Sequence, residues 1–265
     1  MYEFVEIERV DAVGRIWLNR PDARNAQNSA MLDELDAAFR ELKEDAGVRV
    51  IILAARGPHF SAGHDLREGA ARRGDFSVEE RWVFEEKRYF EYSMNIWDCP
   101  KPTIAQVQGG CIAAGFMVAN MCDLMVASES AYFSDPVCHT LSAAAVEVLI
   151  HPWVLGLRKA KEMLFTGGRL TAAEALAAGM ANKVVPDAEL ADATMALAQQ
   201  VAKAKPFALQ LTKRSLNRSF DAQGFRNALN AHFDTHQLSH RTEEYMAVRR
   251  AGLDGALRKE ADKTA

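Results

Sequence analysis

The sequence has few of the residues that hold small extracellular domains together. It contains four cysteines (Cys99, Cys111, Cys122 and Cys138), and no two of them have C-x-x-C spacing. A disulfide framework and a cysteine-based zinc or redox site are therefore not predicted. The N-terminal stretch has neither a basic region nor an apolar core, so we expect no secretory signal, reduced thiols and a cytoplasmic protein.

An excess of positive charge is also lacking. The net charge is -4 and the pI is near 6.0, which gives no support for a nucleic-acid partner. The longest mostly apolar passage, Val107–Ala127, is interrupted by Gln108, Asn120 and Asp123. We therefore expect a buried strand–loop–helix–strand passage there and no membrane span. With 49% apolar and 26% charged residues, the chain has the composition of an ordinary globular protein.

Strand and helix patterns alternate over the first two-thirds of the chain. The expected strands are Tyr2–Val10 and Gly14–Leu18, paired as a hairpin, then Val50–Ala54, Thr103–Val107 and Leu124–Ala127. Helices are expected around 31–42, with Ser29 as a possible cap, and from 78 to 97 after a Ser77/Glu80 capping box. Thr171 and Glu174 form a second capping box. After Asp187 we predict helices only, at 187–203, 206–219, 222–238 and 241–250, so an α/β core with a helical C-terminal region is indicated.

Two glycine-containing loops follow predicted strands. The first is Arg56–Leu66 and the second is Gln108–Met117. In an open α/β sheet, ligands bind beyond the carboxyl ends of the strands, where these loops are expected. Gly63 allows a turn that exposes the N–H groups after it, and the second loop leads into the positive end of a helix. Such loops can bind a ligand oxygen through peptide N–H groups, although ordinary glycine turns would give the same spacing, and the P-loop signature is absent.

Several motifs, in order, resemble the enoyl-CoA hydratase/isomerase (crotonase) family. They are Gly14–Ala26, Phe60–Leu66, Pro102–Val107, Gly109–Asp123, Ala131–Pro136 and Phe165–Thr171, and the resemblance spans roughly residues 3–250. It implies a crotonase-like α/β fold of repeated ββα units, with 1–200 as the core and 201–265 as a helical trimerisation region. It also implies an acyl-CoA ligand, a homotrimer or dimer of trimers, and no cofactor other than the coenzyme A of the substrate.

The resemblance assigns roles to individual residues. The N–H groups of His64 and Ala114 would form an oxyanion hole, and such donors stabilise the enolate of a thioester. The nucleotide of coenzyme A would lie along Ala23, Arg24 and the strand edge at Ala62, with Leu66 nearby. Gly110 of the second loop and Asp65, which would tie down the first loop, are also placed in the substrate site. Trp82, Phe84 and Tyr89 would shape the acyl chamber, although core packing explains aromatic residues of this kind equally well.

The sequence departs from the hydratase pattern at two positions. The two glutamates that hydratases of this family use would lie at Met117 and Val137, and neither side chain can exchange a proton. The usual hydration of an enoyl thioester is therefore not expected. Glu147, in a predicted apolar helix at 143–150, and His139 are the candidate replacements. A raised pKa would suit Glu147 to acid–base work, but a solvent-facing glutamate is the alternative.

Three other interpretations compete with the acyl-CoA enzyme. Ser61 with His64 could suggest a hydrolase, but Phe-Ser-Ala-Gly is not a nucleophile elbow. His59, His64 and Asp65 have the spacing of no common metal site, so no metal is predicted. A catalytically silent acyl-CoA-binding protein is the competing class. The two classes differ in one feature. An isomerase, hydrolase, decarboxylase or lyase would have Asp135, His139 or Glu147 facing the thioester, and a silent binding protein would have none of them there.

Overall fold

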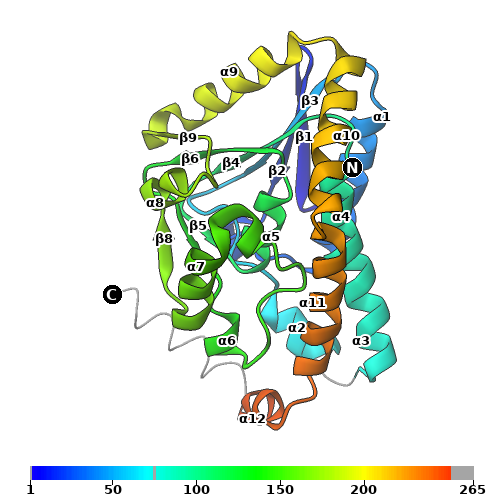
Figure 1. Cartoon of the computed structure of the whole chain (residues 1–265), viewed down its shortest axis with the longest axis vertical. Coiled ribbons are helices and arrows are strands. Elements are labelled where there is room, and N and C mark those ends of the chain that lie inside the picture. The colour runs from blue at the N-terminus through cyan, green and yellow to red at the C-terminus, as the bar shows by residue number, and fades with distance from the viewer. Residues whose placement is uncertain (1, 74–75, 252–265) are drawn as a thin grey trace.

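The computed structural model describes residues 2–73 and 76–251, which form a large sheet, a small sheet and surrounding helices (Figure 1). The large sheet has six strands in the order β1-β2-β3-β4-β6-β9; β1 and β2 are antiparallel and the other neighbours are parallel. The predicted hairpin and buried strands are confirmed. The strands are β1 (Val5–Val10), β2 (Val13–Leu18), β3 (Val50–Ala55), β4 (Thr103–Val107), β6 (Leu124–Ser128) and β9 (Lys183–Val185).

Helices cover both faces of the large sheet, which explains why β3 is apolar throughout. All six residues of β3 are buried. On one face, Val50, Ile52 and Ile104 pack against α9 (Leu190–Ala202), which crosses the sheet in Figure 1. On the other face lies the main core, to which α1 (Ser29–Glu44) and α5 (Ala114–Asn120) contribute. The sheet is thus a rigid layer whose strand ends can hold loops in place.

Each strand of the small sheet is followed along the chain by a helix. Its order is β5-β7-β8, with β5 parallel to β7 and β8 antiparallel to β7. The passage 107–127 is a buried strand, loop, helix and strand, as predicted, and no helix in the described ranges is long and apolar enough to cross a membrane. The elements here are β5 (Gly110–Ile112), β7 (Tyr132–Ser134), α6 (Val137–Thr140), α7 (His151–Thr166), β8 (Arg169–Thr171) and α8 (Ala172–Ala177).

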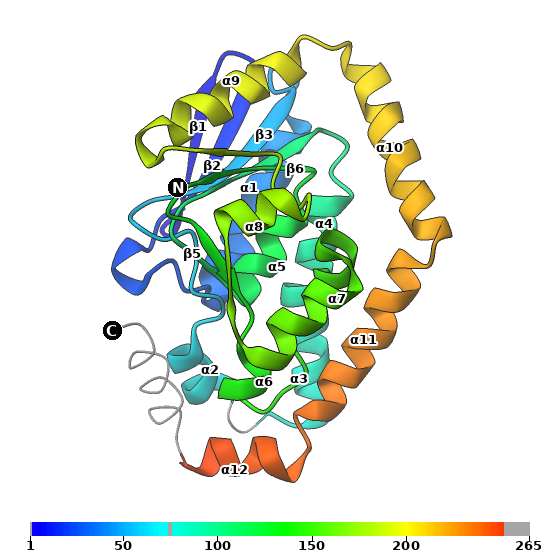
Figure 2. The same cartoon turned by 60° about the vertical axis from the view of Figure 1, so that its left-hand side comes forward.

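The C-terminal helices run along one long edge of the molecule. Figure 2 shows α10 (Pro206–Ala222) and α11 (Phe225–Ser239) following each other down this edge, with α12 (Glu243–Ala251) turning beneath it. Phe233 of α11 packs against Trp82 and Phe90, so α11 lies against the helical segment that begins at Val78. The helices predicted after Asp187 are confirmed, and α11 also contributes to the cavity described below.

Three local predictions need correction. Asn28, rather than Ser29, caps α1, because its side chain accepts the Met31 N–H. The predicted helix 78–97 consists of α3 (Val78–Glu85), a π-helical segment (Glu86–Glu91) and α4 (Tyr92–Trp97). The predicted helix 143–150 is wrong: the chain there is irregular, and Ala145 has a positive φ of 47° that an α-helix does not allow. Both predicted capping boxes, at Ser77 and Thr171, are present.

Candidate active site

The two predicted ligand loops lie against each other. They are joined by backbone hydrogen bonds of ordinary length and by two side chains: Gly110 N–H donates to His59 Nδ1 over 3.0 Å, and Gln108 Nε2 donates to Gly57 O over 3.0 Å. The backbone bonds run from Phe60 N to Gln108 O (2.9 Å), from Ser61 N to Gly110 O (3.1 Å) and from Ile112 N to Ser61 O (2.9 Å). Burial, and then Arg24, lower the pKa of His59, which suits the acceptor role of its ring. The two strand ends thus present one combined surface.

Two peptide N–H groups on this surface are available to a ligand. Gly63 has a φ of +88°, and a Cβ added there would lie 3.3 Å from the nitrogen of Ala114, so the two loops are in close approach. Ala114 begins α5, where the N–H groups have no partner within the helix. Within the described ranges, neither the His64 nor the Ala114 N–H donates to a protein acceptor. Ala113, which precedes Ala114, has a φ of 49°, which is unusual for a residue with a Cβ. The backbone of this candidate ligand loop is therefore locally strained.

Buried polar side chains hold the first loop in place. Asn25 donates to the carbonyl oxygens of Arg56 (2.8 Å) and His59 (2.9 Å), which clamps the start of the loop. The Ser61 hydroxyl donates to Asn25 O at 2.8 Å and accepts the Gly63 N–H at 3.2 Å. Ser61 is fully buried by these contacts, and the His64 ring points elsewhere. The structure therefore contradicts the Ser–His hydrolase alternative.

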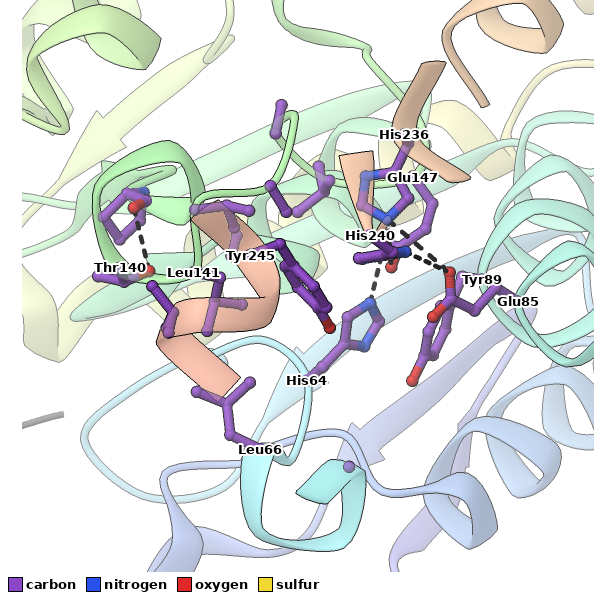
Figure 3. A pocket seen from close by; sticks show the side chains of 18 of the residues that line it. His64, Leu66, Glu85, Tyr89, Thr140, Leu141, Glu147, His236, His240 and Tyr245 are labelled. Carbon is purple, nitrogen blue, oxygen red and sulfur yellow. Dashed lines mark hydrogen bonds and ion pairs between the residues drawn. The ribbon is translucent and has the colours of Figure 1, made fainter. Parts of the chain in front are cut away.

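A cavity of about 280 Å³ lies beside the two loops (Figure 3). Most of its wall is apolar, and α12 closes one side with Tyr245 and Val248. Charged and aromatic side chains gather at one end, as the close view shows. The lining comprises Ala62, His64, Leu66, Gly69, Ala70, Arg81, Glu85, Tyr89, Ile112, Ala113, Pro136, Val137, Thr140, Leu141, Ala143, Ala145, Val146, Glu147, His236, His240, Tyr245, Val248 and Arg249.

Glu147 lies between two histidines at the polar end of this cavity. Its Oε2 is 3.0 Å from His64 Nε2, and its Oε1 is 3.4 Å from His236 Nε2. Burial works to raise the pKa of Glu147, yet the two imidazoles outweigh it and hold that pKa well below its ordinary value. Burial likewise works to lower the pKa of His236, but Glu147 and then Glu85 raise it to about 9. The raised pKa expected for Glu147 is therefore wrong in direction, because histidines surround the carboxylate.

A second carboxylate, Glu85, lies behind the first. Its Oε1 accepts a hydrogen bond from Arg81 at 2.9 Å, and its Oε2 accepts one from Gln237 at 2.7 Å. Glu85, His236 and His240 are all buried, and one ligand atom from each lies within 4.8 Å of the others, which is close enough to hold a metal ion. The Tyr89 ring stacks on His64 at a centroid distance of 3.7 Å and fixes the plane of that imidazole.

The structure brings together some of the residues named from the sequence. Ala62, His64, Leu66, Val137 and Glu147 all line the cavity. Ala114 lies just behind the lining, on the second loop. Ala62 also donates its N–H to the carbonyl of Arg24, which places exposed Arg24 and half-buried Ala23 beside the first loop, outside the cavity lining.

Other predicted site residues lie elsewhere, for physical reasons visible in their contacts. Met117 is fully buried in the core on α5. Trp82 packs against Phe233 because the helix phase turns Arg81, Glu85 and Tyr89, at four-residue spacing, toward the cavity instead. Phe84, which shares the acyl-chamber prediction, is buried beside Tyr89 without lining the cavity.

Polar contacts explain the remaining positions. Asp65 pairs with Arg20 at 3.1 Å and accepts two N–H groups at the start of α2 (Leu66–Arg73), so it holds the first loop. His139 is exposed, outside the cavity, with its Nε2 2.8 Å from the carbonyl of Phe165. Gly110 packs under the hydroxyl of Tyr132. Asp135 faces His151 at 3.2 Å, and both are fully buried away from the cavity.

Sequence reasoning missed the contribution of the C-terminal region to this site. His236, His240 and Tyr245 line the cavity although even His236 lies 65 positions beyond Thr171, the end of the last matched motif. The available signal was the spacing of His232, His236 and His240, which are four residues apart and therefore share one helix face.

The fold and the site together define an α/β protein with two backbone-donor loops over a cavity that carries a buried carboxylate–imidazole cluster. The sequence profile of the enoyl-CoA hydratase/isomerase family matches residues 8–254. The chain belongs to the enoyl-CoA hydratase/isomerase family, and its fold is the crotonase-like fold expected from the motifs.

Relatives bear out this assignment. EchA13 of Mycobacterium tuberculosis, whose name describes it as an enoyl-CoA hydratase, is 43% identical to this chain over 261 residues. The match covers 90% of this chain and 81% of the relative. The human mitochondrial Delta(3,5)-Delta(2,4)-dienoyl-CoA isomerase is 35% identical over 215 residues, covering 78% of this chain and 66% of that protein. A crystal structure from Mycobacterium smegmatis, described as an enoyl-CoA hydratase, shares 48% identity with a TM-score of 0.85 and covers 89% of this chain and 94% of its own.

Proposed function

We propose that the protein is an isomerase that moves a double bond within an unsaturated acyl-CoA thioester. The observation that supports this most directly is the His64–Glu147 pair, a proton-exchanging unit at the end of an apolar cavity and beside two unused peptide N–H groups. An isomerisation adds and removes no atoms: one proton leaves a carbon on one side of the double bond and one proton is added on the other side.

The two loops supply the electrostatic part of the proposal. Removal of a proton near the thioester places negative charge on its carbonyl oxygen. The N–H groups of His64 and Ala114 are fixed donors, and a preorganised pair of this kind stabilises the enolate without reorganisation. Gly63 lets the first loop approach Ala114 closely, which brings the two donors near each other.

The proton transfer is assigned to the His64–Glu147 pair, with Glu147 as the base, because its lowered pKa keeps the carboxylate ionised and able to accept a proton at neutral pH. The pair comes from the first loop and from the irregular segment 141–150, and Val137 lies in the apolar wall of the same cavity. Hydration would need a second proton-exchanging group that positions water. Glu85 is engaged by Arg81 and Gln237, and the positions of the usual glutamates hold Met117 and Val137, so a shift of one proton fits this site better than the addition of water.

Coenzyme A is placed at the open side of the first loop. Ala62 and Leu66 border the cavity, and Arg24, whose carbonyl accepts the Ala62 N–H, is exposed and able to meet a phosphate. The acyl chain then extends along the apolar wall toward Leu141 and Tyr245. A relative named as a dienoyl-CoA isomerase supports the choice of an unsaturated acyl group.

Assays with 3-enoyl-CoA and 3,5-dienoyl-CoA in D₂O test the proposal. We expect conjugated products, followed by their ultraviolet absorption, and deuterium in the acyl chain by NMR. Crotonyl-CoA is the control substrate, and its hydration is expected to be negligible.

Each other outcome rejects part of the proposal. Hydration of crotonyl-CoA at an ordinary enzyme rate, about 1–1,000 per second, would show that water is activated after all. Tight binding of acyl-CoA by calorimetry without turnover of any ester would favour the silent binding protein. A chain that binds no CoA ester would contradict both functions.

We also propose that the chain forms a homotrimer or a dimer of trimers. Large apolar side chains are exposed on two helices: Phe165 (72%) on α7, and Phe207 (71%) and Leu216 (62%) on α10. Burial of such side chains between subunits is favourable by about 1.5–3 kcal/mol each. Light scattering after gel filtration is expected to give three or six chain masses, and the F207E/L216E double variant is expected to dissociate. A wild-type monomer at micromolar concentration would contradict the assembly.

A further inference from the structure

The cluster formed by Glu85, His236 and His240 has the geometry of an ion-binding site. Glu85 Oε2 is 3.8 Å from His236 Nε2 and 3.8 Å from His240 Nδ1. Glu147 Oε1 is 3.4 Å from the same nitrogen of His236. Figure 3 shows these side chains pointing toward one another from α3, α11 and the segment before α7.

These distances fit a shared ion better than direct hydrogen bonds. Hydrogen bonds between nitrogen and oxygen have lengths of about 2.7–3.2 Å. Zinc bonds of about 2.0–2.2 Å set the ligand atoms of a tetrahedral site about 3.4 Å apart. His236 is only 3% exposed, and its Nε2 has no well-formed hydrogen bond to any described residue, so this nitrogen points into the cluster at ion-pair distance from Glu147 and Glu85.

Outer contacts orient the candidate ligands as metal sites require. His236 Nδ1 lies 3.0 Å from the carbonyl oxygen of Ala144, so it acts as the donor when the ring is neutral and leaves Nε2 with its lone pair toward the cluster. Arg81 donates to Glu85 Oε1 and Gln237 donates to Glu85 Oε2, so both carboxylate oxygens are held in place. Metal ligands typically have such partners, because they hold each ligand in its binding orientation.

The helices place the three side chains in a suitable pattern. His236 and His240 are four residues apart, at the end of α11 and just after it, and therefore lie on one face. Two histidines with this spacing recur in helical zinc sites. Glu85 ends α3 where the π-helical segment Glu86–Glu91 begins, and π-helical segments are frequent at functional sites.

We propose that Glu85, His236 and His240 bind one divalent transition-metal ion, with zinc as the first candidate. Two imidazoles and one carboxylate form a donor set that zinc and other first-row divalent ions accept, and Glu147 Oε1 lies where a fourth ligand belongs. The ion joins α11 to α3 at the polar end of the cavity. This site includes none of the first-loop residues His59, His64 and Asp65, whose spacing predicts no metal. The argument for this site does not rest on the acyl-CoA reaction, although Glu147 is shared between the two.

The test uses the full chain after EDTA treatment and dialysis. Titration calorimetry with ZnCl₂ and elemental analysis are expected to give one zinc ion per chain, and zinc is expected to raise the melting temperature, since it binds the folded state. E85Q and H240A should each weaken zinc binding by at least about tenfold. H232Q is the matched control on the same helix: His232 Nε2 contacts the carbonyl of Val146, so this variant should retain the wild-type affinity.

Two results overturn the site. One is the absence of zinc binding by the wild-type chain, and the other is an equal zinc affinity in wild type, E85Q and H240A, which places the ion elsewhere. If a ligand variant does not fold, wild-type chain loaded with Co²⁺ decides the question. A visible spectrum typical of tetrahedral coordination, removed by added zinc, supports the site, and the spectrum of the hydrated ion rejects it.

Discussion

Replacement of Glu147 by glutamine is expected to lower the turnover of an unsaturated acyl-CoA by about 10²–10⁴-fold, the usual contribution of a general base. Glutamine keeps the shape of the side chain and can still contact His64, but it cannot accept the substrate proton. Because Glu147 is 4% exposed and sits at the end of the cavity, the affinity for the CoA ester should change little. Steady-state turnover and calorimetric affinity for the same ester measure the two effects separately.

A matched variant distinguishes Glu147 from the other acid–base candidate in the sequence. H139Q changes a histidine that is exposed and contacts the Phe165 carbonyl, so turnover should stay within about twofold of wild type. If E147Q retains most of the wild-type turnover while folded, Glu147 is not the base. A large loss in H139Q would likewise show that the helix α6 region, rather than the segment 141–150, supplies the proton-transfer group.

The layers and the loops could be predicted from the sequence because their signals are local. Val50–Ala54 is apolar without interruption, which indicates a strand covered on both faces, and the loop after it must lie at the carboxyl edge of the sheet. The capping boxes at Ser77 and Thr171 are likewise read from residues three positions apart. Structural features that depend only on residues close together in the sequence can be predicted from the sequence alone.

The acid–base cluster could be predicted only in part because it is assembled from distant segments. Glu147 was selected by its position, but the helix expected around it does not form, since Ser142 and Ala145 both have positive φ that their sequence does not signal. The partner His236 is 89 positions further along the chain, on α11. Periodicity predicts that α11 is a helix, but it does not say which loop that helix contacts.

The proposed oxyanion hole allows a sharper test than most backbone sites, because Ala114 is the first residue of α5. Proline is well tolerated at the first position of a helix, where its missing N–H has no partner within the helix. A114P therefore removes one donor to the thioester oxygen while α5 is retained. A loss of about 10²–10³-fold in turnover is expected, which corresponds to about 2.7–4 kcal/mol for one oxyanion donor.

The control for this change is A114G, which keeps the N–H and should remain within a few-fold of wild-type turnover. Folding needs its own measurement, because Ala114 is fully buried and a Cβ at Gly63 would already lie 3.3 Å from its nitrogen. Melting curves of both variants provide this measurement.

An independent readout is the infrared carbonyl stretch of a ¹³C-labelled thioester bound to wild-type protein. Two donors should lower its frequency relative to water, and A114G should preserve the shift. An unshifted carbonyl frequency in the wild-type complex would contradict the role of this N–H group. A folded A114P variant with full turnover would also contradict it, because the methyl side chain of Ala114 offers no donor of its own.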